Sequence, residues 1–513
     1  MRYVPDAAQM KAADQYTIHD LGIPSLKLME RAARSYVDIL KEKKVDLSHV
    51  CIVCGSGNNG GDGFAIARIL AKEGYRVTVV MAGNVSRCTA ETLYQMDLLK
   101  QTGTKITDQF QTDSYTVVVD AIFGVGLSRK IEGHYKELIE ELNRSSGIKF
   151  AVDIPSGICA DNGMVLGTAF QADITVTFQA EKFGLFLYPG KEYAGEVIVK
   201  DIGISEVYFL QNQKVAVVYD ENDYQKMLPV RKPDSHKGTY GRLLVIAGSK
   251  GMSGAAYMNA VSAYQVGAGL VEVYTVEENR VILQQLLPEA IISTYHEFHE
   301  KEILDKLDLA DAVCIGSGMG TGELSAKILK TVIFHAKVPC VIDADGLNIL
   351  SQHMWYLEKK MHSQYIFTPH MKEMSRLTGR DIVTIKNNRK EIIEEFSDQY
   401  QVTCVLKDSR TLVKSANERL SINLTGNSAM AKAGSGDVLA GIIAGLLVQT
   451  KSCHQAAVLG VYLHGCCGDV ARREKGNYSV MARDLINAIS TVFQREEGII
   501  DEEIQSNLCA SRS

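Results

Sequence analysis

Strand-like apolar runs alternate with helix-like stretches twice along this chain, once on each side of a polar segment. In the first half these runs lie at 50–55, 76–83, 115–124, 149–157, 172–178 and 195–203. Amphipathic stretches such as 61–74 and 91–103 separate them. Strands that are apolar throughout and separated by helices predict a parallel sheet covered on both faces.

The polar segment 219–241 contains two prolines and interrupts this pattern, so we place a domain junction near residue 215. Further apolar runs follow at 241–249, 270–276, 311–320, 339–346, 364–370, 402–408, 411–415 and 419–424. The last three are close enough to form hairpin-like strands, and long helices follow to about residue 496, before a tail of a dozen residues. A chain of 513 residues exceeds the roughly 250–300 that one core accommodates. The sequence therefore predicts two α/β domains, at 1–215 and 225–500.

Composition excludes several classes of protein. The net charge is -6 and no dense Lys/Arg cluster occurs, which argues against nucleic acid as the main partner. The first residues lack the apolar core of a signal peptide. The longest apolar stretch, 438–448, is interrupted by glycines and is shorter than the ~20 residues of a membrane span. We expect a cytoplasmic protein that has no membrane partner.

Cysteine and histidine spacing gives two candidate metal or redox sites. Cys51 and Cys54 form a C-x-x-C pair, but both lie within a strand-like run. His464, Cys466 and Cys467 cluster in a helix-like stretch without a second cysteine pair at zinc spacing. For both groups we favour burial in the core.

The first glycine-rich loop, GSGNNGGDG (55–63), follows a strand and opens a helix. Gly55, Gly57 and Gly60 match the G-x-G-x-x-G pattern of dinucleotide-binding loops. A hydride-transferring enzyme of that type carries an acid after its second strand, whereas this chain has MAGN (81–84). Hydride transfer is therefore a disfavoured alternative.

Oxygen-bearing side chains follow three strands of the predicted first sheet. Asn59 lies in the glycine-rich loop, Asp120 ends the next strand, and Asp153 and Ser156 follow the one after. Ligands bind at the carboxyl ends of parallel strands, and such oxygen donors suit a hard cation. A single aspartate of this kind often only caps a helix, but the set as a whole favours a site.

The motifs NNGGDG, VDAIFGVGL and VDIPSG resemble the N-terminal epimerase domain of NAD(P)H-hydrate repair enzymes, which interconverts the R and S hydrates of NADH and NADPH. The resemblance covers about residues 1–215 and implies a Rossmann-like three-layer domain. It implies potassium bound by Asn59, Asp120 and Ser156, and a contribution of Asp153 to acid/base chemistry. It also implies hydrate binding by Asn58, Asn59, Gly60, Gly61, Asp62, Gly124, Val125, Gly126, Leu127, Ser128, Arg129, Lys130 and Asp153. Lys182 is either a second polar group of that site or a solvated loop lysine.

The second glycine-rich loop, AGSGDVLAGIIAG (433–445), runs into an apolar helix. The amides of Gly434, Ser435 and Gly436 predict an anion site that the helix dipole strengthens. Asp437, which we expect to be the first helical residue, either takes a proton from a hydroxyl during phosphoryl transfer or caps the helix. The chain contains no G-x-x-x-x-G-K-[ST] motif and is therefore not a P-loop enzyme.

This loop resembles the signature of the ribokinase-like superfamily. HKGTYGRLLVIAGS (236–249), GSGMGTG (316–322), VIDADGLN (341–348) and TPHMKEMSRL (368–377) narrow the resemblance to the ADP- or ATP-dependent hydrate dehydratase. It implies a ribokinase-like domain that uses Mg²⁺ with ADP or ATP and that assembles as a homo-oligomer. Asp437 is the implied catalytic base. The hydrate-binding residues implied are Ala255, Gly318, His370 and Asp437, and the nucleotide-binding residues are Lys407, Asp408, Ser409, Arg410, Thr411 and Gly436.

The resemblances together predict repair of hydrated NADH and NADPH (NADHX and NADPHX) by epimerisation and nucleotide-dependent dehydration, with release of phosphate. A small-molecule kinase is the main alternative, since the ribokinase-like superfamily phosphorylates sugars and vitamin precursors. A non-catalytic cofactor sensor is a third hypothesis, disfavoured because Asp437, Asp153 and Asn59 are all present. The preference for ADP or ATP stays open.

Overall fold

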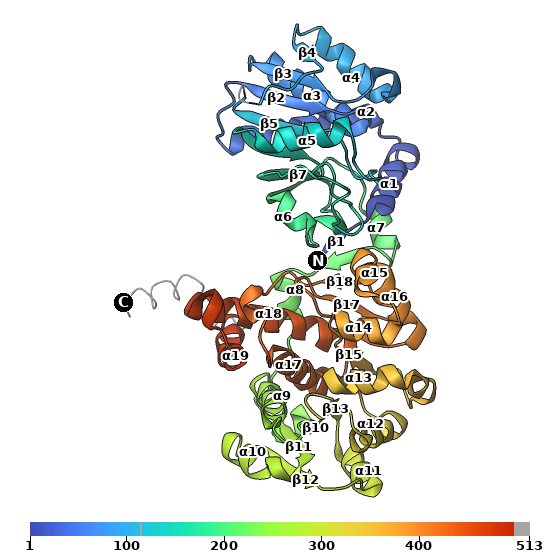
Figure 1. The fold of residues 1–513 in the computed structure, drawn as a ribbon, viewed down its shortest axis with the longest axis vertical. Helices are drawn as coiled ribbons and strands as arrows, with labels where there is room; N and C mark the ends of the chain where they lie inside the picture. Colours follow the sequence, from blue (N-terminus) through green and yellow to red (C-terminus); the bar gives the residue numbers. More distant parts are fainter. Residues whose placement is uncertain (113–114, 497–513) are drawn as a thin grey trace, which may run out of the picture. The chain divides into compact units, whose positions relative to one another are not determined.

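The structure, a computed structural model, describes residues 1–112 and 115–496, so the tail expected at the end of the chain lies outside the described residues. The chain divides into two compact units, an N-terminal unit of Arg2–Ala216 and a C-terminal unit from Val217 on. Figure 1 draws both units, and each is described by itself below.

The N-terminal unit is built on a sheet in the order β4-β3-β2-β5-β6-β7-β8. All of its strand pairs are parallel, as predicted. Ile52, for example, lies opposite Val79 on one side and Val119 on the other. The strands are β2 (Val50–Cys54), β3 (Val77–Met81), β4 (Lys105–Thr107), β5 (Val117–Ala121), β6 (Ile148–Val152), β7 (Ile174–Phe178) and β8 (Glu196–Lys200).

Helices cover both faces of this sheet because alternate residues of each strand point to opposite sides. Ile52 packs in one core with α2 (Ser25–Glu42), α3 (Asn58–Lys72) and α4 (Ala90–Lys100). Its neighbour Val53 packs in the other core with α5 (His134–Arg144). This arrangement confirms the three-layer α/β prediction. The remaining elements are β1 (Arg2–Val4), α1 (Ala7–Gln15), η1 (Tyr16–Asp20), η2 (Val85–Arg87), η3 (Phe183–Leu185), α6 (Gly190–Ala194) and α7 (Val207–Gln211).

The C-terminal unit has a larger mixed sheet in the order β9-β18-β17-β16-β15-β14-β13-β10-β11-β12. The pairs β16–β17 and β17–β18 are antiparallel, whereas the other pairs in this order are parallel. The predicted late hairpins are therefore confirmed. The strands are β9 (Ala216–Val218), β10 (Arg242–Ile246), β11 (Leu270–Val276), β12 (Ile291–Tyr295), β13 (Ala312–Ile315), β14 (Cys340–Ile342), β15 (Tyr365–Phe367), β16 (Thr403–Leu406), β17 (Leu412–Ser415) and β18 (Ser421–Ile422).

One face of this sheet packs against α9 (Ser253–Gln265), α17 (Ser435–Thr450), α18 (Cys453–Ser479) and α19 (Ala482–Glu496). Helix α17 is apolar almost all round, since α9 and α18 cover the sides that the sheet does not. Helices of the opposite layer are visible on the other side of the sheet in Figure 1. The other helices of the unit are α8 (Glu221–Met227), α10 (Arg280–Leu286), α11 (Glu300–Leu309), α12 (Glu323–His335), α13 (Ala344–Gln352), α14 (Met371–Thr378), α15 (Ile382–Asn387) and α16 (Arg389–Tyr400).

The sequence prediction missed four strands, β1, β4, β9 and β12. Of these, β4 and β12 each lie at one edge of their sheet and pair with a single neighbour. The residues of β4 are exposed or half-buried, and only Tyr295 of β12 is buried. An edge strand needs no continuous apolar run, so the pattern that predicted the central strands was absent here.

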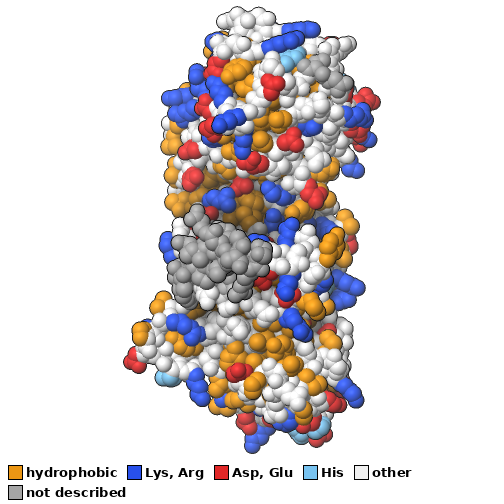
Figure 2. Space-filling view, turned by 90° about the vertical axis from the view of Figure 1, so that its left-hand side faces the viewer, with side chains coloured by type: hydrophobic (Ala, Val, Ile, Leu, Met, Phe, Trp, Pro, Cys, Tyr) orange, Lys and Arg blue, Asp and Glu red, His pale blue; other side chains and the backbone are white. Residues whose placement is uncertain are grey.

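None of the helices within 1–112 and 115–496 is both long enough and apolar enough to cross a bilayer. On the face drawn in Figure 2, acidic and basic side chains are intermingled.

Candidate active sites

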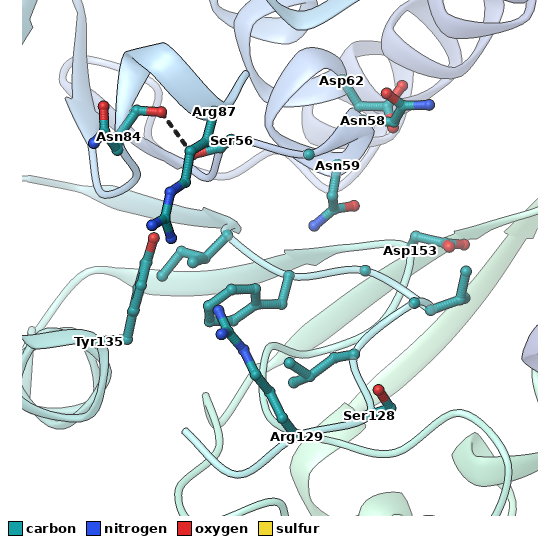
Figure 3. A pocket seen from close by; sticks show the side chains of 17 residues that line it. Ser56, Asn58, Asn59, Asp62, Asn84, Arg87, Ser128, Arg129, Tyr135 and Asp153 are labelled. Carbon is teal, nitrogen blue, oxygen red and sulfur yellow. Dashed lines mark hydrogen bonds between the residues drawn. The ribbon is translucent and has the colours of Figure 1, made fainter. Parts of the chain in front are cut away.

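The N-terminal unit contains a cavity of about 590 Å³ that lies at the carboxyl edge of its sheet. Side chains from the loops 55–63 and 123–130 line this cavity. Figure 3 shows Asp153 and Asp62 at one end of it and Arg87 and Tyr135 at the other. The predicted site residues that line it are Asn58, Asn59, Asp62, Gly124, Val125, Gly126, Leu127, Ser128, Arg129 and Asp153. Of the four residues predicted at strand ends, Asn59 and Asp153 line this cavity, whereas Asp120 and Ser156 do not.

Gly60, Gly61 and Lys130 are not among the residues that line this cavity. A Cβ atom on Gly60 would lie 1.9 Å from the carbonyl oxygen of Gly55, so the two backbone segments approach too closely for any side chain. One on Gly61 would lie 2.7 Å from Cε of Met29 in α2. These two glycines permit close packing at the start of α3, and Lys130 is exposed beside the cavity loop.

Asp153 is held by a buried lysine that the sequence left ambiguous. Lys182 is 1% exposed and forms an ion pair with Oδ1 of Asp153, so the solvated-loop interpretation is wrong. Its Nζ also donates to Thr177 Oγ1 at 2.8 Å and to the carbonyl of Phe178 at 3.0 Å. Asp153 itself has φ 67°, in the left-handed region. The structure therefore supports Lys182 as a polar group of this site.

Three donors converge on one oxygen of Asp153. Oδ1 accepts hydrogen bonds from Thr177 Oγ1 and from the amide of Phe178, both at 3.1 Å, and from Lys182. The hydrogen bonds found for this carboxylate within the described residues all go to Oδ1. The arrangement fixes the carboxylate at the cavity wall and directs Oδ2 away from these donors.

Asp62 lies near two further carboxylates. Desolvation, together with the negative charges of Asp153 and Asp14, raises the pKa of Asp62 well above its usual range, and Lys182 opposes this shift. Burial and the charge of Asp153 also raise the pKa of Asp14, which belongs to α1. Asp62 and Asp14 therefore each ionise less readily than an exposed aspartate.

Asp120 and Ser156, two of the three predicted potassium ligands, are in direct contact. Ser156 donates to Asp120 through its hydroxyl at 2.6 Å and through its amide at 2.7 Å. Asp120 is fully buried, and burial raises its pKa to about 6. Within the described residues it forms no ion pair with a lysine or arginine. Asn59, whose buried Nδ2 has no hydrogen-bond partner there, lies beside Gly124.

These contacts fit a hard monovalent cation, because a buried carboxylate without a basic partner needs a compensating positive charge. The hydroxyl of Ser156 and the amide oxygen of Asn59 are the neutral oxygen donors that such an ion accepts. No group of three or more His, Cys, Asp or Glu side chains placed to hold a metal ion occurs among residues 1–112 and 115–496.

The predicted hydrate-binding residues leave out seven of the residues that line the cavity, and four of these carry polar side chains, namely Ser56, Asn84, Arg87 and Tyr135. Ser56 donates to the carbonyl of Asn84 at 3.2 Å, which ties the loop after β3 to the loop after β2. Asn84 and Arg87 follow β3, the strand that we examined only for an acid. A basic residue a few positions after a central strand is the sequence signal that points to Arg87.

In the C-terminal unit, residues after five adjacent parallel strands meet at the carboxyl edge of the sheet. Gly318 follows β13, has φ 59° and packs so closely on α9 that an added Cβ would lie 2.9 Å from Cβ of Ala255. His370 follows β15 and Lys407 follows β16, and a parallel bridge joins these two residues. Ala255, Gly318, His370 and Lys407, predicted from separate motifs, therefore lie at one edge.

Lys407 is the centre of a buried charge network. Its Nζ lies 2.9 Å from Oδ1 of Asp343 and 3.9 Å from Oε2 of Glu373. Although burial opposes the shift, these carboxylates raise the pKa of Lys407. Burial and the charge of Asp343 raise the pKa of Glu373 to about 7, which Lys407 opposes. Asp343 also accepts a hydrogen bond from Thr368 Oγ1 at 2.6 Å and was not predicted as a site residue.

Asp437 faces this network from the start of α17. The helix begins at Ser435, so the prediction that Asp437 is its first residue was wrong by two positions. Gly434, with φ 90°, is the N-cap residue because the chain turns there through the left-handed region. Burial, followed by the charge of Asp343, raises the pKa of Asp437 to about 6, against a hydrogen bond from Ser317 and the charge of Lys407.

The glycine-rich loop contacts the lysine directly. A Cβ atom on Gly436 would lie 3.6 Å from Nζ of Lys407, so the first turn of α17 and the lysine face the same space. Of the three predicted anion-binding amides, that of Ser435 donates to the carbonyl of Lys432 at 3.3 Å. The hydroxyl of Ser435 lies 3.3 Å from Nε2 of buried His464, whose pKa burial lowers to about 4.

His370 is positioned by a capping box at the start of α14. Its Nδ1 accepts hydrogen bonds from the amides of Lys372 and Glu373 at 3.0 and 3.1 Å. Glu373 in turn accepts from the amide of His370 at 2.7 Å. Burial and the charge of Lys407 lower the pKa of His370. The histidine is therefore a neutral ring that carries its proton on Nε2.

The segment from Lys407 to Thr411 connects β16 and β17, as predicted. Asp408 forms an ion pair with buried Arg389 at 2.9 Å, and Arg410 donates to the carbonyl of Leu424 at 2.9 Å. Thr411 donates to the carbonyl of Asp408 at 3.3 Å, and Ser409 is exposed. These contacts engage the side chains of Asp408, Arg410 and Thr411 within the protein and fix the shape of the turn.

The candidate cysteine sites are part of the core. Cys51 and Cys54 are buried free thiols of β2, and burial raises the pKa of both. Cys466 and Cys467 lie with His464 in α18, and Cys467 is fully buried.

The two units thus define a class, that of two-domain α/β enzymes with a carboxylate-bearing site at the carboxyl edge of each sheet. Residues 25–184 match the family model described as "YjeF-related protein N-terminus", and residues 243–491 match that described as "NAD(P)H-hydrate dehydratase". A ribokinase-like superfamily protein of Enterococcus faecalis has 28% sequence identity and a TM-score of 0.50, covering 55% of this chain and 96% of its own.

Two relatives are similar over nearly the whole length. The bifunctional NAD(P)H-hydrate repair enzyme of Moorella thermoacetica is 33% identical, covering 99% of this chain and 99% of its own. That of Escherichia coli is 33% identical over 93% of this chain and 91% of its own. The chain belongs to the family of bifunctional NAD(P)H-hydrate repair enzymes.

Proposed function

We propose that this chain repairs NADHX and NADPHX in two steps, on two domains. Residues 1–215 interconvert the R and S hydrates, and residues 225–500 dehydrate the S hydrate in a reaction that consumes ADP or ATP and releases phosphate. The observation that carries the proposal is the pairing of the two sites: a cavity lined by Asp153 in one unit, and Asp437 beside a glycine-rich helix start in the other.

In the first domain, Asp153 exchanges protons with the hydrate while Lys182 holds its carboxylate in place. Donors concentrated on Oδ1 leave the other oxygen for the ligand. Asn59, Asp120 and Ser156 would hold a potassium ion, whose positive charge would balance the buried Asp120 carboxylate. Ser156 also accepts the amide of Phe123 at 2.8 Å, which connects the ion-binding residues to the cavity loop.

In the second domain, the magnesium complex of ADP or ATP is the co-substrate. Hydration places a hydroxyl on the ring carbon next to nitrogen, and hydroxide is a poor leaving group. Asp437 takes the hydroxyl proton as the terminal phosphoryl group is transferred to that oxygen. The helix-start amides and Lys407 stabilise the transferred charge. The ring nitrogen then assists departure of phosphate, and loss of a proton from the adjacent carbon restores the double bond.

His370 contributes a neutral N–H donor to the hydrate, and Gly318 and Ala255 leave room for it. The site is thus built for a hydroxyl that becomes a leaving group. We also propose that the protein is cytoplasmic and homo-oligomeric, which cell fractionation and light scattering will test.

The test is the recovery of absorbance at 340 nm from a mixture of both NADHX epimers, with magnesium and either ADP or ATP. Full recovery with stoichiometric free phosphate is expected. Recovery that stops when only the R epimer is left would contradict the epimerase assignment. A stable phosphorylated product without NADH would support a small-molecule kinase instead.

A further inference from the structure

The proposed epimerase cavity has two chemically different ends. At one end are the carboxylates of Asp62 and Asp153, and at the other Figure 3 shows Arg87 and Tyr135. Hydrated NADH and NADPH differ only by a phosphate on the adenosine ribose, which is remote from the nicotinamide ring. An elongated ligand whose ring reacts at the carboxylate end extends its adenosine toward the other end.

Arg87 lies where dinucleotide-binding sheets distinguish the two coenzymes. In such sheets an acid after the second strand binds the ribose 2′-hydroxyl, whereas an arginine there accommodates a 2′-phosphate. Strand β3 is followed by Asn84, Val85, Ser86 and Arg87 without an acid. The first carboxylate further along is Glu91, which accepts a hydrogen bond from Ser25 at 3.0 Å.

The backbone that carries Arg87 is fixed by several hydrogen bonds. Asn84 Oδ1 accepts from the amide and the hydroxyl of Ser86 at 2.9 and 2.8 Å, and the amide of Arg87 donates to the carbonyl of Asn84 at 2.9 Å. The hydroxyl of Ser56 donates to the same carbonyl at 3.2 Å. The amide of Thr89 donates to the carbonyl of Ser56 at 3.1 Å. The loop is thereby joined to the glycine-rich loop on both sides of Arg87.

The guanidinium of Arg87 takes part in no ion pair within residues 1–112 and 115–496, whereas that of Arg68 in the same unit pairs with Glu30. An arginine that lines a cavity on a fixed backbone, without a carboxylate partner, is suited to bidentate binding of a phosphate.

We propose that Arg87 binds the 2′-phosphate of NADPHX and makes the epimerase site prefer NADPHX over NADHX, an inference that rests on the proposed function. Loss of one charge-assisted contact lowers affinity about tenfold or more. The ratio of kcat/KM for NADPHX to that for NADHX is expected to fall about tenfold in Arg87→Ala, and to be partly restored in Arg87→Lys. Adenosine 2′,5′-bisphosphate is expected to inhibit the Arg87→Ala enzyme about tenfold more weakly.

The experiment follows conversion of the purified R hydrates by chromatography, without ADP or ATP so that dehydration does not interfere. Arg144→Ala removes an exposed arginine of α5 that is outside the cavity lining, and is expected to leave both activities unchanged. Arg129→Ala removes the other cavity arginine and is expected to change the ratio less than threefold. An equal loss on both substrates in Arg87→Ala, or an equal ratio shift in Arg129→Ala, would overturn the proposal. Absence of epimerisation by the unmodified protein on either substrate would instead overturn the proposed function.

Discussion

The two sites use the same pair of residue types, an aspartate and a lysine, in different ways. In the N-terminal unit Lys182 is bonded to Asp153 itself. In the C-terminal unit Lys407 forms an ion pair with Asp343. The charges of both residues shift the pKa of Asp437 at the start of α17, Asp343 upward and Lys407 downward. The difference shows that a directly bonded lysine fixes the orientation of a carboxylate, whereas a lysine bonded to a third residue leaves the reactive carboxylate accessible to substrate.

This comparison also separates what each lysine can contribute. Lys182 is occupied by Asp153, Thr177 and Phe178, so its role is to position Asp153. Lys407 lies beside Gly436. Its ammonium group can therefore bind an incoming phosphoryl group while it also contacts the Asp343 carboxylate. We therefore expect the first lysine to control stability and orientation, and the second to control charge on the transferred group.

The largest effect should come from Asp437→Asn, which removes the proposed base and keeps the side-chain shape. Dehydration of the S hydrate should fall about 10³-fold, because a positioned base contributes about 10²–10⁴-fold. Epimerisation, measured on the same preparation without nucleotide, should be unaffected, since Asp437 belongs to the other unit.

Asp308→Asn provides the matched control for that measurement. Asp308 is an exposed carboxylate of α11 whose ion pair with Lys337 lies at the surface. It should retain normal dehydration. Near-normal turnover by Asp437→Asn would contradict the role of Asp437 as the base in dehydration. It would also remove the contrast between an accessible Asp437 and a fixed Asp153.

A smaller effect is expected from Lys182→Met, which keeps the length of the side chain but removes its charge. Breaking a buried ion pair costs about 3–5 kcal/mol, and we expect the lower end because 15% of the Asp153 side chain is exposed. Epimerisation should slow about 10²-fold, while dehydration of purified S hydrate continues.

Thermal unfolding followed by circular dichroism checks the stability change, and chromatography of the R hydrate checks the rate. Lys191→Met, an exchange at a half-buried lysine of the short helix α6, is the control. If Lys182→Met lowered stability without slowing epimerisation, Lys182 would be a structural residue only, and the two lysines would no longer be comparable.

The sequence predicted the central parts of both sheets because those strands are continuous apolar runs. It also brought Asp120, Asp153 and Ser156 to one edge, since Asp120 lies at the end of β5, and Asp153 and Ser156 come within four residues of the end of β6. It did not reveal Lys182 as buried, because AEKFGL reads as a charged loop and the ion pair depends on a residue 29 positions earlier. Asp343 was overlooked for a similar reason: its partners Thr368 and Lys407 come from other strands.

Backbone detail was also beyond the sequence pattern. The start of α17 at Ser435 follows from the positive φ of Gly434, which a run of small residues does not specify. The edge strands β4 and β12 have no apolar signature because solvent covers one side of each.

The smallest effect is the pH dependence of dehydration, which tests whether Asp437 is the carboxylate that reacts with the substrate. A base acts in its deprotonated form, and the pKa of Asp437 is raised to about 6. The kcat/KM for dehydration should therefore be constant above about pH 7 and fall tenfold per pH unit below about 6. Glu373, with a pKa of about 7, and His370, whose pKa is lowered by burial and by Lys407, also titrate nearby, and Asp343, Asp345 and Lys407 face this space. Initial rates at saturating nucleotide should keep this profile in Glu373→Gln, whereas a loss of the inflection in that variant would assign the titration to Glu373 instead.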